Sequence, residues 1–266
     1  MSQGIVCAPQ PEAVEAGVLA LERGGNAVDA AIACALVQTA IDPQMCGIAG
    51  FGSMQLYLPD QGQHHFIDFH GRAPAATQED MWEDIVISET EDGFGFVLEG
   101  GVNDLGYQSI TSPGSIKAFA EAIERYGNLT LAELLEPAIE YCEQGFAVRT
   151  HVASYWNLVE AAGRIPHIER LRAIPATAKI YTREDGSIYK AGEILRNPDM
   201  GNTYRRIASA GVEDFYQGEI ASKIAADMKD NGGLLSADDL RDFQTEQREP
   251  VWGKFHGYEV ATNPLP

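Results

Sequence analysis

Residues 24–36 read GGNAVDAAIACAL, and this stretch decides more about the fold than any other part of the chain. Its two glycines end an amphipathic helix that the sequence predicts over residues 11–23. Asn26 is a preferred N-cap, and Asp29 three positions later can return the bond, so the spacing predicts a capping box. The helix that this cap opens, residues 27–41, is apolar on nearly every side. We therefore expect it to be buried, with its alanines allowing close approach by neighbouring elements.

A glycine-rich loop and a hairpin follow this helix. Residues 51–59 and 64–69 are typical of two strands, and PDQGQ between them is typical of a hairpin connection. The loop CGIAGFG, residues 46–52, leads into a strand rather than from a strand into a helix. It is therefore not a dinucleotide fingerprint, and it lacks the lysine of a phosphate-binding loop. We interpret its glycines as sites of close packing rather than as a ligand cradle.

The rest of the chain is dominated by helical patterns. Thr130 with Glu133 predicts a second capping box. Residues 80–110 are acidic and glycine-rich, which indicates a surface excursion. A turn that leads into a helix is expected over residues 111–127. Further helices are expected over 130–148, on to about residue 175, and over 192–211, 214–233 and 236–244. A strand pair is expected over 248–266. Helices on both sides of a hairpin, with strands arriving late, predict a layered α/β domain.

Length and charge exclude several classes of protein. The chain has 266 residues, 39 acidic and 19 basic, and a formal net charge of −20. Such an acidic surface repels phosphate backbones, so we expect no nucleic-acid partner. No run approaches 18 apolar residues, so we expect no membrane span. The first residues lack a signal-peptide pattern, which predicts a cytoplasmic protein, or a periplasmic or extracellular one if the chain has been trimmed.

The four cysteines are Cys7, Cys34, Cys46 and Cys142. None belongs to a CxxC pair, and their spacing fits neither a zinc knuckle nor a disulfide framework. We expect buried free thiols. Cys46 is singled out because it precedes the glycine-rich loop.

The stretch HHFIDFHGRAP, residues 64–74, gathers three histidines, an aspartate and an arginine. On a strand, alternate residues share a face, so the polar residues at 64, 68, 70 and 72 would point the same way. His64, Asp68 and His70 could ligate a metal, but the two histidines are about 20 Å apart on an ideal strand. Only two ligands could then share an ion, and the neighbouring arginine disfavours a cation. We expect neither a metal nor another cofactor.

A clamp for a substrate carboxylate fits this stretch better. Arg72 offers a planar guanidinium group that matches a carboxylate with two parallel hydrogen bonds. Asp68 could orient that group or bind a substrate ammonium. The competing interpretation is a solvated strand end, because exposed arginines are ordinary on protein surfaces.

The chain offers no evident nucleophile. It contains no GxSxG motif. Thr150 and His151 put a hydroxyl beside an imidazole, but neighbours in sequence rarely point at each other, and no third member is evident. We interpret this pair as incidental.

Several motifs occur in a fixed order along the chain. They are residues 24–36, CGIAGFG at 46–52, residues 68–74, SPGSIKAF at 112–119, EPAIEYCEQGFAV at 136–148, residues 215–240 and GYEV at 257–260. Together they closely resemble the large-subunit region of the γ-glutamyltranspeptidase family, over essentially the whole chain.

The resemblance implies an α+β fold, the four-layer αββα sandwich of N-terminal nucleophile hydrolases, incomplete in this chain. Residues 1–266 would be the large-subunit portion of one such domain. In the family, a precursor cleaves itself, and the threonine at the new N-terminus attacks a γ-glutamyl amide such as glutathione to form an acyl-enzyme. That threonine lies further downstream. The resemblance therefore implies no catalytic residue in this chain, no activity of the chain alone, and the small-subunit portion of the same precursor as its partner. It leaves the oligomeric state open, a homo-oligomer included.

One departure from the family concerns the substrate-binding arginine. The family frame is Asp-x-Arg-Glu-x-Ala-Pro, whereas here His70 follows Asp68 in the arginine's place and Arg72 stands two positions on. Two residues along a strand keep the same face and move the attachment by about 6.6 Å. We predict that Arg72 still binds the substrate carboxylate, with Asp68 beside it and His70 as a modulator. The changed clamp indicates a different acyl donor, or hydrolysis favoured over transfer. The alternatives are a γ-glutamyl donor, a cephalosporin or glutaryl donor, a non-catalytic relative and a metallohydrolase.

Overall fold

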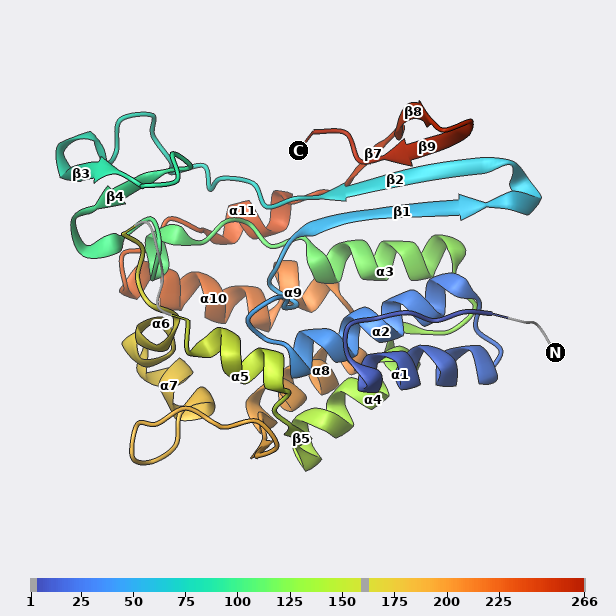
Figure 1. Ribbon diagram of the computed structural model, residues 1–266, viewed down its shortest axis with the longest axis horizontal. Coiled ribbons are helices and arrows are strands. Elements are labelled where there is room, and N and C mark those ends of the chain that lie inside the picture. Colours follow the sequence, from blue (N-terminus) through green and yellow to red (C-terminus); the bar gives the residue numbers. More distant parts are fainter. Residues whose placement is uncertain (1–3, 159–162, 266) are drawn as a thin grey trace.

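The computed structural model describes residues 4–158 and 163–265, which form an α+β fold of helices and small antiparallel sheets (Figure 1). The helices are α1 (Pro11–Glu22), α2 (Ala27–Ile41), α3 (Ser115–Tyr126), α4 (Leu131–Gln144), α5 (Thr150–Trp156), α6 (His167–Ala173), α7 (Pro175–Tyr181), α8 (Pro198–Ala210), α9 (Glu213–Gln217), α10 (Glu219–Asp230) and α11 (Ala237–Asp242). The strands are β1 (Gly52–Leu58), β2 (Gln63–Phe69), β3 (Val86–Glu89), β4 (Phe96–Leu98), β5 (Phe146–Ala147), β6 (Ile194–Leu195), β7 (Glu246–Arg248), β8 (Val251–Phe255) and β9 (Tyr258–Thr262).

Helix α2 is the buried centre of the molecule, as predicted. The side chains of Leu36 and Val37 are fully buried. The predicted capping box is confirmed, since the Asn26 side chain accepts from the Asp29 amide and the Asp29 carboxylate accepts from the Asn26 amide at 2.7 Å. The same buried carboxylate accepts bonds from the amides of Asn128 and Leu129. One aspartate therefore both caps α2 and fixes the turn between α3 and α4.

Helix α1 packs closely on α2 because it carries a glycine at the contact. A Cβ on Gly17 would lie 2.6 Å from Sγ of Cys34 on α2. Helix α1 itself has the predicted start at Pro11 and ends one residue before the predicted position.

Strands β1, β2 and β7 form a three-stranded antiparallel sheet in the order β1-β2-β7. The predicted hairpin is confirmed, with Gly52 opposite Phe69 and Leu58 opposite Gln63. Gly62 closes its turn in the left-handed region, at φ 63°. The sheet lies over α3 (Figure 1), where the rings of Phe69 and Phe119 pack edge to face. The four-layer arrangement itself stays a prediction.

Several predicted helices are shorter than the pattern suggested. Helix α4 has its predicted capping box at Thr130 but ends at Gln144, because Gly145 takes φ 97°. The helix expected up to about residue 175 is broken into short pieces, with Pro166 and Pro175 each at the start of one. Residues 159–162 of that expectation lie outside the described residues. Helix α8 begins only after the Asn197 cap, because Ile194 and Leu195 pair with β5 instead.

The late strand pair and the surface excursion are both confirmed. Strands β8 and β9 form a hairpin with exposed faces. The excursion carries the β3–β4 hairpin and projects from one end of the molecule (Figure 1). None of the described helices is long and apolar enough to cross a membrane.

The expectation of buried thiols was only partly right. Cys34 and Cys142 are buried and Cys46 is half-buried, but Cys7 is exposed. Cys7 lies in the extended segment before α1, where no second element covers it. All four thiols are free.

Candidate functional site

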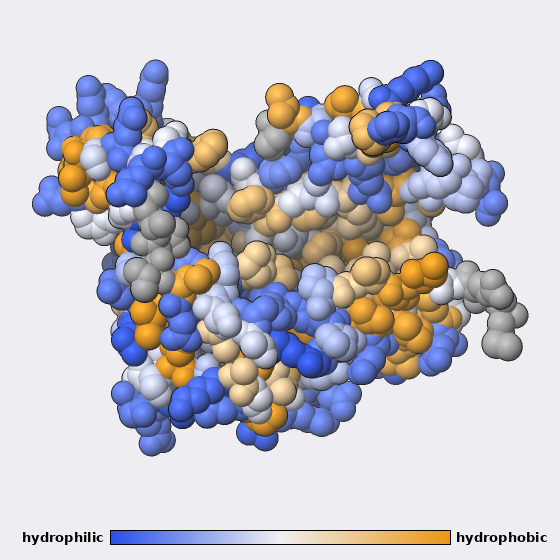
Figure 2. Space-filling model, in the orientation of Figure 1, coloured by the Kyte–Doolittle hydropathy of each residue, from blue (hydrophilic) through white to orange (hydrophobic). Residues whose placement is uncertain are grey.

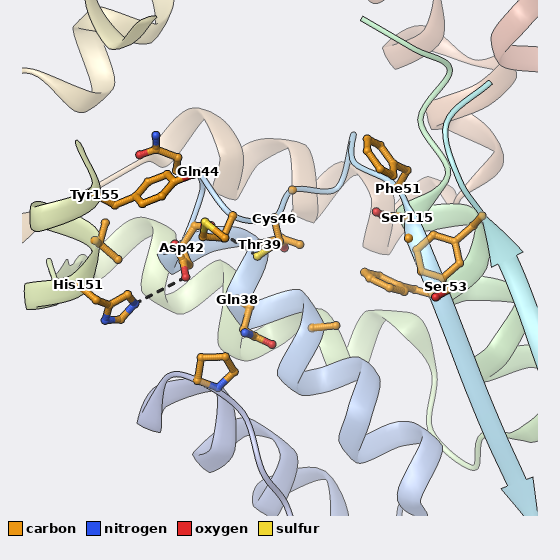
Figure 3. A pocket seen from close by; sticks show the side chains of 18 residues that line it. Gln38, Thr39, Asp42, Gln44, Cys46, Phe51, Ser53, Ser115, His151 and Tyr155 are labelled. Carbon is orange, nitrogen blue, oxygen red and sulfur yellow. Dashed lines mark hydrogen bonds and ion pairs between the residues drawn. The ribbon is translucent and has the colours of Figure 1, made fainter. Parts of the chain in front are cut away.

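A pocket of about 590 Å³ opens between the C-terminal end of α2, the glycine-rich loop and α5 (Figure 3). Figure 2 shows this face of the molecule hollowed between the sheet and the helices below it. The sheet side is lined by the rings of Phe51, Phe69 and Phe119, together with Ser53 and Ser115. The opposite side carries Asp42 and His151. The volume of the pocket is within the range of cavities that hold small molecules.

The polar end of the pocket is organised around the buried carboxylate of Asp42. Oδ2 of Asp42 accepts a 2.6 Å hydrogen bond from Nε2 of Gln10 and lies 3.7 Å from Nε2 of His151. Gln38 donates to Oε1 of Gln10 at 2.9 Å. Burial raises the pKa of Asp42, and the opposing effects of His151 and Gln10 do not cancel it. These contacts therefore join the segment before α1 to the C-terminal end of α2 and to α5.

This cluster was missed at the sequence level. In the sequence, Asp42 is only the residue that follows the predicted helix 27–41, and His151 is only the neighbour of Thr150. No local spacing joins the two residues, because α5 reaches α2 only through the tertiary fold. The ring of His151 lies beside Asp42 and Gln10, with its Nε2 3.7 Å from Oδ2 of Asp42 and 3.4 Å from Nε2 of Gln10.

The glycine-rich loop holds the start of α3. The carbonyl of Gly50 accepts from the amides of Gly114 and Ser115, at 2.8 and 3.0 Å. Close packing explains two of the loop's glycines, since a Cβ on Gly50 would lie 2.9 Å from the carbonyl oxygen of Gly47 and one on Gly52 would lie 3.1 Å from Cε2 of Phe69. A Cβ on Gly47 would meet no atom within 4 Å, so the interpretation does not hold for that glycine.

Cys46 sits in this loop, and burial together with the charge of Asp42 raises the pKa of its thiol to about 12. A thiol with so high a pKa is a poor nucleophile at neutral pH.

The second feature of the site is a charged corner where β2 meets β7. Asp68 accepts from Nδ1 of His70 at 2.7 Å and from Nη1 of Arg248 at 2.9 Å. Its carboxylate is mostly buried. Burial opposes its ionisation, but the backbone and side chain of His70 and the side chain of Arg248 outweigh it, so the pKa of Asp68 lies below its ordinary value. The corner thus holds a permanent anion at neutral pH.

Arg72 does not share this carboxylate. Its Nη2 contacts Oε1 of Glu246 at 2.7 Å, and its guanidinium group lies 5.8 Å from the ring centre of Phe243. The suggestion that Asp68 orients Arg72 is therefore wrong for this structure, because Arg248 takes that place. The Arg72 backbone is held by a 2.8 Å bond from Ser112 N.

Steric crowding explains why a glycine stands between His70 and Arg72. A Cβ on Gly71 would lie 2.1 Å from Oγ1 of Thr111. Only glycine lets the chain pass Thr111 and bring the Arg72 side chain towards β7. His70 turns the other way, with its ring 5.9 Å from that of Phe51 on the edge of the pocket.

The described residues offer no metal site. No group of three or more histidine, cysteine, aspartate or glutamate residues is placed to hold an ion in the described ranges. His64 donates to or accepts from Oε1 of Gln55 at 3.0 Å and packs against Trp252, away from the Asp68–His70 pair. The three candidate ligands are thus divided between two locations.

The fold matches that of solved transpeptidases and of a solved acylase. The Helicobacter pylori gamma-glutamyltranspeptidase structure superposes with a TM-score of 0.85 at 27% identity, covering 98% of this chain and 70% of that one. A cephalosporin acylase from Bacillus halodurans gives a TM-score of 0.78 at 31% identity, covering 95% of this chain and 44% of that one. These likenesses place the chain in a class of α+β folds whose solved members include a transpeptidase and an acylase.

The family is shown by the sequence. The family model described as Gamma-glutamyltranspeptidase matches residues 13–266. The chain is 31% identical over 263 residues to a glutathione hydrolase proenzyme of Bacillus subtilis (strain 168), covering 99% of this chain and 42% of that protein. It is 33% identical over 265 residues to the Acylase ACY 1 proenzyme of Pseudomonas sp. (strain V22), covering 100% of this chain and 45% of that protein. The chain belongs to the gamma-glutamyltranspeptidase family, and it spans less than half the length of these curated relatives.

Proposed function

We propose that this chain is the large-subunit portion of an enzyme that cleaves γ-glutamyl amides such as glutathione. The match of residues 13–266 to the family model is the observation that carries this proposal. Relatives of this chain are named glutathione hydrolase proenzymes, which supports both the reaction and a precursor that is processed. The partner of the chain is then the small-subunit portion of the same precursor.

The chemistry belongs to a threonine downstream of residue 266, at the N-terminus that processing frees. Its α-amine takes the hydroxyl proton as the oxygen attacks the amide carbonyl. The C–N bond then breaks, the amine leaves with that proton, and the acyl group stays on the threonine oxygen. Water or an acceptor amine releases the acyl group in the second step. Backbone donors stabilise the oxyanion in both steps.

Within this chain, Arg72 is the proposed ligand for the substrate carboxylate. Its side chain is about half exposed, so a ligand can reach it, and the ring of Phe243 supports one face of the guanidinium group. Asp68 holds the ring of His70 through its 2.7 Å contact with Nδ1. His70 modulates the site from the pocket side, where Phe51 lies next to it.

A second candidate function has its own support. His70 stands where the family pattern has the substrate-binding arginine, and the chain is similar to acylases as well as to glutathione hydrolases. An acylase acting on a glutaryl or cephalosporin side chain would use the same fold and the same nucleophile. A non-catalytic relative is the third alternative.

Donor profiling of the full-length protein tests these alternatives. The donors are the γ-p-nitroanilide of L-glutamate, glutaryl-p-nitroanilide and a glutaryl cephalosporin. Turnover of the glutamyl compound with little turnover of the others supports the leading proposal. Preferred turnover of a glutaryl compound establishes the acylase, and no turnover of any donor identifies a non-catalytic relative.

A further inference from the structure

The pocket at the C-terminal end of α2 carries a negative charge that the proposed reaction does not use. Among the described residues that line it, Asp42 supplies the one carboxylate, and neither lysine nor arginine is present. The side chain of Asp42 is only 7% exposed, so its charge belongs to the pocket and not to the outer surface. A ligand that matches this pocket in charge is therefore a monocation.

One of the two carboxylate oxygens of Asp42 is left for such a ligand. Oδ2 accepts the 2.6 Å hydrogen bond from Nε2 of Gln10, while Nε2 of His151 lies 3.7 Å away, outside the range of a hydrogen bond. No residue in the described part of the chain donates a hydrogen bond to Oδ1. Because the side chain has lost most of its contact with water, a charged donor at Oδ1 stabilises it more than a neutral donor does.

The other side of the pocket fits an apolar group. In Figure 3, Phe51 lies on the sheet side, and Asp42 and His151 lie on the opposite side. Phe51 is 62% exposed and stands at the rim, whereas the rings of Phe69 and Phe119 are buried. Aromatic rings pack against apolar groups, and their faces also attract a cation. A ligand that reaches from Asp42 to these rings therefore has a cationic end and an apolar body.

We propose that this pocket binds an organic ammonium ion that has an aromatic body and no carboxylate. The ammonium group donates to Oδ1 of Asp42, and the body packs against the rings on the sheet side. A carboxylate on the ligand is disfavoured, because the lining offers no lysine or arginine to bind it and Asp42 repels it. Arg72 does not line this pocket, so the site is separate from the proposed carboxylate ligand. The inference concerns binding alone and does not rest on the proposed function.

Three small molecules test the two ends of the pocket. Phenethylamine has the ammonium group and the ring, phenethyl alcohol has the ring with a neutral hydroxyl, and L-phenylalanine adds a carboxylate to the amine. Calorimetric titration of the full-length protein measures each affinity at neutral pH and about 0.15 M salt, which screens attraction by exposed charges. The variants are Asp42→Asn and Phe51→Ala. Glu143→Gln is the matched control, because it removes a carboxylate that does not line this pocket.

We expect the wild-type protein to bind phenethylamine about 10- to 100-fold more tightly than phenethyl alcohol, the difference for a charge-assisted hydrogen bond. L-Phenylalanine should bind no more tightly than the alcohol. Asp42→Asn should abolish the preference for the amine, and Glu143→Gln should keep it. Phe51→Ala should weaken the amine and the alcohol alike, because both lose the same ring contact, so the ratio of their affinities is kept.

Several outcomes overturn the inference. Equal affinities of the amine and the alcohol for the wild-type protein refute the ammonium site, and so does the absence of binding by all three molecules. An unchanged preference in Asp42→Asn, with the wild-type unfolding midpoint, places the ammonium group elsewhere. If Asp42→Asn does not fold, Phe51→Ala decides, because undiminished binding of the amine by that variant places the ligand outside this pocket.

Discussion

Nη1 of Arg248 on β7 lies 2.9 Å from Oδ2 of Asp68 on β2, and so joins residues that are 180 positions apart. The same nitrogen donates to the carbonyl oxygen of Leu265 at 2.8 Å. His70 binds the other oxygen of the carboxylate at 2.7 Å. One buried anion therefore fixes the end of β2, strand β7 and the segment after β9, and the segment that carries Arg72 begins at this anchor.

The first prediction concerns that anchor. Asp68→Asn should lower the free energy of unfolding by about 1–3 kcal/mol, because it weakens charge-assisted bonds and leaves the Arg248 guanidinium group without its anion. Urea unfolding of the full-length protein measures the change. A double-mutant cycle with Arg248→Gln should show coupling, whereas Glu143→Gln with Arg205→Gln, on an exposed pair, should show about 0–1 kcal/mol. Additive effects at residues 68 and 248 would contradict the account.

The carboxylate of Asp68 also predicts that part of the protein's stability is lost at acid pH. Since the pKa of Asp68 is lowered in the folded protein, its contribution is fully present above the ordinary value of 3.8 and is lost as the pH falls through the lower folded value. Unfolding free energies of wild type and Asp68→Asn should therefore converge only below that ordinary value. Convergence at pH 5 or above would mean that the carboxylate is not stabilised in the folded state.

For Asp42, the expected change of stability with pH has the opposite sign. Its pKa is raised by burial, so the folded state binds a proton more tightly than the unfolded state does. Stability should fall as the pH rises from 3.8 towards the raised folded value. Asp42→Asn should remove this part of the profile while Gln10 keeps an oxygen to bind. A variant with the same pH profile as the wild type would contradict the prediction.

Arg72→Ala should weaken binding of carboxylate-bearing donors by about 10- to 100-fold, the loss expected for charge-assisted hydrogen bonds. Steady-state kinetics of the full-length protein would show this in KM, with Arg72→Lys intermediate because lysine keeps the charge without the planar group. Arg205→Ala is the control. Unchanged kinetics of Arg72→Ala would assign the carboxylate to another residue.

Gly114 tests the contact between the glycine-rich loop, the sheet and α3. A Cβ there would lie 2.4 Å from the carbonyl oxygen of Phe69 and 2.8 Å from Cζ of Phe243. Gly114→Ala should cost about 1–3 kcal/mol of stability, as for an overpacked core. Gly47→Ala, where a Cβ would meet no atom within 4 Å, should change stability by less than about 0.5 kcal/mol. Equal effects of the two substitutions would contradict this packing.

Local chemistry predicted much of the fold. The capping boxes at Asn26 and Thr130 were predictable because each needs only residues three positions apart. The β1–β2 hairpin was predictable because its strands and turn are contiguous. Helix lengths after residue 145 were not, since tertiary pairing of β5 with β6 took residues that the pattern assigned to a helix.

The candidate site was predicted only where its residues are neighbours in sequence. Asp68 and His70 could be grouped because a strand places them on one face, and the structure joins them. The partners Arg248 and Glu246 come from β7, whose register against β2 no local pattern contains. The contact of Asp42 with His151 depends in the same way on how α5 meets α2.

The most direct test of the central claim is the intact mass of the purified full-length gene product under denaturing conditions. The account predicts two fragments, the larger containing residues of this chain and the smaller beginning with threonine. A threonine-to-alanine substitution at that junction should give one unprocessed mass. A single unprocessed mass for the wild-type protein would contradict the claim that this chain is part of a self-processing amide-cleaving enzyme.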